Sequence, residues 1–161
     1  MFVIYESDEL RAATLPNVIL LAWHLAPTAS TIREVGAKMA RHHEAHPEGV
    51  VIVNCICGGA PDDAARRAFR EVGEKTVRSV AGVVLVFPEH GLRTALAKTV
   101  VLGIRVATRA RFPIRVADSI AAIGSMVRTM LEGRVSQPPG SAEIETALRV
   151  LSGPCQRARV S

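Results

Sequence analysis

The sequence LRAATLPNVILLAW at residues 10–23 decides how this chain begins to fold. Two mainly apolar runs, Leu10–Leu15 and Val18–Trp23, flank the pair Pro16 and Asn17. Proline presets the backbone of a tight turn and asparagine tolerates its less common angles, so this pair predicts a reversal of the chain. We therefore predict a β-hairpin at residues 10–23, with residues 1–5 as an additional edge strand.

The stretch that follows the hairpin has the pattern of a helix. Hydroxyl side chains at residues 28 and 30 are typical of a helix start. Ile32, Val35 and Met39 then recur at the spacing that puts them on one helical face. The sequence Pro-Glu-Gly at residues 47–49 ends the pattern, so we predict a helix that runs to about residue 46.

Strands and helices alternate along the next part of the chain. Apolar runs predict strands at residues 50–57, 81–87 and 112–116, and amphipathic patterns predict helices at residues 62–79, 92–111 and 120–131. Strands with almost no polar alternation are typical of a sheet that is covered on both faces. Helical crossovers make such strands mostly parallel. We predict an α/β domain over residues 1–132, followed at 133–161 by a linker, a short helix at 142–151 and a basic tail.

Composition limits the class of protein. Apolar residues make up 48% of the 161 residues and aromatic residues only 4%, which predicts an aliphatic core. No apolar run approaches the ~20 residues that cross a bilayer, and three cysteines without regular spacing fit a reducing cytoplasm. The net charge of +5 suits an acidic partner, but the absence of basic runs with interleaved aromatic residues disfavours nucleic acid.

The predicted order of elements resembles the STAS superfamily, the sulfate-transporter and anti-sigma-factor-antagonist domains. It is most similar to the bacterial branch that also resembles CRAL-TRIO lipid-transfer domains. The hairpin at 10–23, the units at 50–80 and 81–111, and the ending at 112–131 carry this resemblance, which spans residues 2–132. It implies a STAS-like mixed sheet and a regulatory protein-binding module that is not an enzyme. The alternative that it implies is a carrier of lipid or another small molecule.

The junction between the strand at 50–57 and the next helix departs from the family pattern. Members that act as phosphorylation switches carry an Asp-Ser-Ser-Gly-like motif there. This chain reads Cys-Gly-Gly-Ala-Pro-Asp-Asp at residues 57–63, without serine or threonine. We therefore expect no switching by serine phosphorylation at this junction.

The stretch from residue 91 to residue 117 contains basic residues and no acidic residue. The predicted interaction surface on its helix consists of Arg93, Lys98, Arg105 and Arg109. A basic helix beside a broad apolar face would suit an acidic protein, a second copy in a homodimer, or an anionic membrane surface. The alternative is a solvated basic rim whose apolar side packs on the sheet.

Polar residues and glycines near predicted strand ends form a candidate ligand-binding set. Its members are His24, Asn54, Gly58, Gly59 and His90. Ligands of open α/β sheets bind at the carboxyl ends of strands, and paired glycines before a helix can admit an anion. The aspartates at 62 and 63 would repel a phosphate, so a plain turn is the favoured interpretation at the glycines. Catalysis by His24, Asn54 or His90 is the least favoured alternative.

Two residue pairs have metal-ligand spacing. Cys55 and Cys57 face the same side of a strand, and His42 and His46 share a helical face. Zinc sites normally need further ligands, which neither pair has. We therefore interpret the cysteines as small buried hydrophobic residues and the histidines as a solvated helix end, and we predict no metal and no cofactor.

Overall fold

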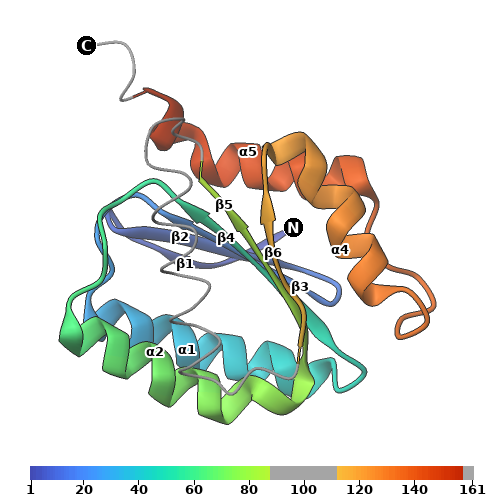
Figure 1. The fold of residues 1–161 in the computed structure, drawn as a ribbon, viewed down its shortest axis with the longest axis horizontal. Coiled ribbons are helices and arrows are strands. Elements are labelled where there is room, and N and C mark those ends of the chain that lie inside the picture. Colours follow the sequence, from blue (N-terminus) through green and yellow to red (C-terminus); the bar gives the residue numbers. More distant parts are fainter. Residues whose placement is uncertain (88–111, 158–161) are drawn as a thin grey trace.

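The computed structural model describes residues 1–87 and 112–157, the last four as backbone only. It confirms the predicted α/β class: a six-stranded mixed sheet carries helices on both faces (Figure 1). The predicted helix at 92–111 lies outside the described residues. No helix in the described part of the chain is both long and apolar enough to cross a membrane.

The strands lie side by side in the order in which they occur in the chain. They are β1 (Phe2–Glu6), β2 (Leu10–Leu15), β3 (Val18–Trp23), β4 (Val50–Ile56), β5 (Val80–Val86) and β6 (Ile114–Ala117). The first three are antiparallel neighbours, and β3 to β6 are parallel. The predicted hairpin is confirmed at both of its strands, and the predicted edge strand is β1.

Asn17 fixes the hairpin turn to the start of β4. Its φ of 60° is the left-handed conformation that asparagine tolerates. The side-chain amide donates to the backbone carbonyl of Gly49 at 2.9 Å and also to the Glu48 carboxylate. The backbone N–H of Val51 donates to the Asn17 carbonyl at 2.9 Å, so the turn also sets the register between β3 and β4.

The two faces of the sheet are covered by helices from different parts of the chain. The first face carries α1 (Ala29–Ala45) and α2 (Asp63–Thr76), which continues as the 3₁₀ turn η1 (Val77–Ser79). The second face carries the 3₁₀ turn η2 (Ile120–Ala122), α4 (Ile123–Leu131) and α5 (Ser141–Arg157). The predicted short helix is therefore longer than expected, because α5 continues into the stretch that was expected to be a basic tail.

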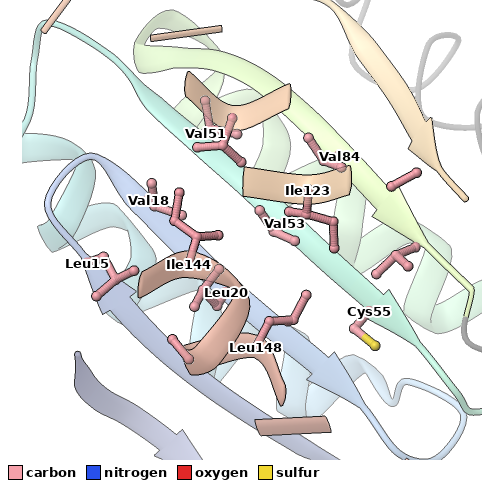
Figure 2. Close-up of a cluster of buried hydrophobic side chains, with 14 of the residues drawn as sticks. Leu15, Val18, Leu20, Val51, Val53, Cys55, Val84, Ile123, Ile144 and Leu148 are labelled. Atoms are coloured by element: carbon pink, nitrogen blue, oxygen red, sulfur yellow. The ribbon is translucent and has the colours of Figure 1, made fainter. Parts of the chain in front are cut away.

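The largest apolar cluster lies between the sheet and the α4–α5 pair. Figure 2 shows its side chains meeting from β2, β3, β4, β5 and both helices. Ile144 and Leu148 of α5 are completely buried there, so α5 is part of the core. On β4, this face is fully buried, whereas Ile52, Asn54 and Ile56 on the other face are only half-buried. Both faces of β4 are covered as expected, but the cover on this second face is incomplete at these three residues, since only Val50 is fully buried there.

Candidate functional site

The outer edge of β1 is the site that stands out on the described surface. Among the residues that the structure describes, β1 pairs with β2 alone. Its first residues are apolar and open to solvent: Phe2 is 72% exposed and Val3 is 47% exposed. Unpaired edges offer backbone hydrogen-bonding groups to another strand, and exposed apolar side chains add to that attraction.

A β-bulge divides β1 into two parts. Phe2 pairs with Thr14 and Val3 with Ala13, but the next residue of β2, Ala12, pairs with Tyr5. The residue left over is Ile4, whose side chain packs against the core under α1. Bulges bend an edge strand and interrupt its ladder, so an incoming strand could not follow β1 along its whole length.

Lys38 of α1 covers the bulge. Its Nζ donates to the backbone carbonyl of Ile4 at 2.6 Å and lies 5.4 Å from the centre of the Tyr5 ring. The ammonium group is thus held by a charge-assisted hydrogen bond and a cation–π contact. We call Phe2 and Val3 the open half of β1 and residues 4–6 its guarded half.

The N-terminus of α1 is anchored through Glu9, which lies in the turn between β1 and β2. The Glu9 carboxylate accepts a hydrogen bond from the Thr28 backbone N–H, and also from the Thr28 and Thr31 hydroxyls at 3.0 and 2.9 Å. Thr28 is itself the N-cap of α1. These contacts fix the helix relative to the sheet and hence place Lys38 over β1.

The C-terminus of α1 is anchored by a buried histidine. His43 is only 4% exposed, and its Nδ1 lies 2.9 Å from the Ser79 hydroxyl. That hydroxyl donates to the Thr76 carbonyl at 3.2 Å, which joins α1 to the end of α2. The expected solvated helix end is therefore correct only in part: Arg41 and Glu44 are exposed, but the face that carries His43 packs against the turn η1.

Burial also changes the acid–base behaviour of this helix end. The Nε2 atoms of His42 and His43 are buried without a hydrogen-bond partner. Burial, with added repulsion from neighbouring imidazoles, lowers the pKa of each histidine to about 4. The rings of His42 and His46 lie 4.5 Å apart, but the described residues contain no group of three or more metal ligands.

The predicted strand-end residues His24 and Asn54 lie on opposite faces of the sheet. Asn54 accepts a hydrogen bond from Trp23 Nε1 at 3.4 Å, on the face of α1 and α2. His24 lies toward α5, where it bonds to the backbone of Leu151 and where burial lowers its pKa. The two side chains are therefore not brought together, and His90 lies outside the described residues.

The close packing of the chain after β4 explains why residue 58 is a glycine. A Cβ atom on Gly58 would lie 2.2 Å from the backbone carbonyl of Leu25, so only glycine fits this close approach. At Gly59 a Cβ would make an ordinary 3.5 Å contact. Asp62 caps α2 by accepting from the Ala65 backbone N–H at 2.7 Å, so α2 satisfies its own N-terminus. These features agree with the interpretation of a plain turn.

Cys55 of β4 and Cys57, which directly follows the strand, lie on the same side as predicted. Their sulfur atoms are 3.9 Å apart, and Cys55 is a free thiol within the larger core cluster. Burial raises the pKa of Cys55 to about 12, which keeps the thiol protonated and unreactive at neutral pH. Cys57 is disulfide-bonded, a role that the interpretation of both cysteines as small hydrophobic residues did not include.

The predicted basic surface of Arg93, Lys98, Arg105 and Arg109 lies outside the described residues. The open half of β1 was not singled out from the sequence, although its signal was present: three successive apolar residues on a predicted edge strand. The position of Lys38 had no such signal, because its contact with Ile4 joins residues 34 apart in the chain.

Comparison with known proteins adds no relative: no family model, curated protein or solved structure matches this chain.

Proposed function

We propose that this chain is a regulatory protein-interaction module, not an enzyme, and that it binds a partner protein through the open half of β1. The observation that carries the proposal is the 72% exposure of the Phe2 side chain on a strand edge that no other described strand pairs with. Aromatic residues contribute strongly to protein interfaces because they bury a large area with few rotatable bonds. The STAS resemblance supports the same class of function, since it implies binding and not catalysis.

The two exposed side chains of the open half point to opposite faces of the sheet. Val3 lies opposite Ala13, which belongs to the core cluster of α4 and α5. Phe2 lies opposite Thr14, the next residue along β2, and therefore faces the other way. A short extended segment of the partner, lying along the edge, would contact both side chains and use the free backbone groups between them.

Photo-crosslinking tests this proposal. A photoreactive phenylalanine analogue replaces Phe2, and in a control protein it replaces Val150, which is 58% exposed on α5. We expect one partner protein to be crosslinked in cells from position 2 and not from position 150. We expect this crosslinked product to disappear when Val3→Asp is added. The same products from both positions, or products that Val3→Asp leaves unchanged, would overturn the proposal.

Small-molecule carriage is a second candidate, favoured by one groove. It has a volume of about 490 Å³ and lies between α4 and the loop that leads to α5. Its lining includes Ser125, Arg128, Thr129 and Glu132, so it suits a small polar molecule better than a lipid. Native mass spectrometry of the purified protein would support this candidate by a bound mass that Arg128→Glu removes, and the unliganded mass alone would count against it.

A further inference from the structure

We infer that Lys38 keeps β1 from pairing with the β1 strand of a second copy, so that the edge is presented by a monomer. This inference does not depend on the proposed partner. It concerns which strand cannot pair with this edge. It rests on three observations: an edge of β1 that is unpaired within residues 1–87 and 112–157, the bulge at Ile4, and the ammonium group held on the Ile4 carbonyl.

The open half alone is too short to join two copies. Only Phe2 and Val3 pair regularly with β2 before the bulge, and the next carbonyl already accepts from Lys38. A ladder between two β1 strands would need the guarded half as well. An incoming strand would then have to displace the ammonium group from Ile4 and remove it from water or from the Tyr5 ring.

Symmetry makes this cost larger for a second copy than for another protein. A two-fold interface contains every residue twice, so pairing of two β1 strands would displace two lysines and bring their like charges into one small interface. A different partner that binds only the open half displaces no lysine, and one that also paired with the guarded half would displace a single lysine. Natural edge strands are commonly protected in this way, by a short strand, a bulge and a lysine together.

Sedimentation equilibrium over a range of concentrations tests this inference. Lys38→Met keeps the aliphatic stem and removes the charge and the donor. We expect it to self-associate about a hundredfold more tightly than the wild type, about tenfold for each lysine that no longer has to be displaced. Arg41→Met removes an exposed cation from the next turn of α1 and is expected to behave as the wild type does.

A further variant tests whether the association occurs through β1, and another serves as a substitute for Lys38→Met. Phe2→Lys in the Lys38→Met background returns a cation to the edge and should restore the monomer. Lys38→Gln is also uncharged and is expected to self-associate more tightly than the wild type. It takes the place of Lys38→Met if Lys38→Met does not fold. The inference is overturned if the uncharged variants associate no more tightly than the wild type, if Arg41→Met associates as they do, or if Phe2→Lys leaves their association intact.

Discussion

β1 and β3 run in the same direction in one sheet and have similar apolar sequences, but they lie in opposite environments. All six residues of β3 are buried, whereas no residue of β1 is completely buried. β3 lies between two strands and two helical layers, whereas among the described strands β1 has a neighbour on one side only. Apolar side chains that stabilise the fold in β3 are therefore available for binding in β1.

The same helix serves both strands in different ways. Ile32, Val35 and Met39 of α1 pack in the core cluster that includes the β3 side chains Ile19 and Leu21. Lys38 leaves the helix toward β1 and covers a backbone carbonyl there. One face of α1 thus excludes water from β3, and the adjacent position restricts what can pair with β1.

The largest expected effect comes from truncating a side chain in the buried strand. Leu20 of β3 is fully buried in the cluster of Figure 2. We expect Leu20→Ala to lower the free energy of unfolding by about 2–5 kcal/mol, because it removes buried methyl groups and leaves a cavity. Phe2→Ala on β1 is the matched control and should cost less than about 1 kcal/mol. Equal losses in urea unfolding would contradict the difference between the two strands.

A second test lies just beyond the carboxyl end of β3, where Gly58 packs closely against the backbone of Leu25. Gly58→Ala would place a Cβ against the Leu25 carbonyl at 2.2 Å, a backbone contact that cannot move aside easily. We expect a loss of about 3 kcal/mol in urea unfolding. The neighbouring variant Gly59→Ala makes only a 3.5 Å contact and should cost less than about 1 kcal/mol. Similar losses for both would show that the close approach is not what requires glycine.

The hairpin was predictable because its information is local. Pro16 and Asn17 specify the turn, the residues on either side form the strands, and the observed strands have the predicted bounds. The larger core was also foreseen in part, since the short helix predicted at residues 142–151 contains Ile144 and Leu148, which are buried in it.

The contacts of α1 were not predictable in the same way. His43 bonds to Ser79 across 36 residues, and which side of α1 is buried there depends on how α2 and η1 pack against it. Charge and helix position alone favoured a solvated histidine. The separation of His24 and Asn54, by contrast, follows from a local rule. Trp23, which bonds to Asn54, and its neighbour His24 lie on opposite faces of the sheet, as adjacent residues of an extended chain do.

Acid should weaken the end of α1 that supports both strands. In the unfolded chain histidine takes up a proton near pH 6.5, whereas in the folded protein the pKa of His43 is about 4. The unfolded state therefore binds more protons between these values, so stability is complete above pH 6.5 and falls as the pH falls toward 4. By pH 5, His43 alone should account for about 2 kcal/mol of this loss. Between pH 7 and pH 5, urea unfolding should show a smaller loss of unfolding free energy for His43→Gln than for the wild type. An equal loss in both proteins would contradict the assignment to His43.

The smallest expected effect lies on β1 itself. Arg11 of β2 and Glu6 of β1 form an ion pair at 3.2 Å, and both side chains are more than one-third exposed. Solvent screens such a pair, so we expect Glu6→Gln to change the free energy of unfolding by less than about 0.5 kcal/mol. If β1 instead depends on this pair for its place in the sheet, the variant should speed hydrogen exchange of β1 amides while β3 amides stay protected. Unchanged exchange in both strands would show that β1 is held by its backbone pairing with β2 and its contacts with α1, and this would leave the Glu6 side chain free to meet an incoming partner.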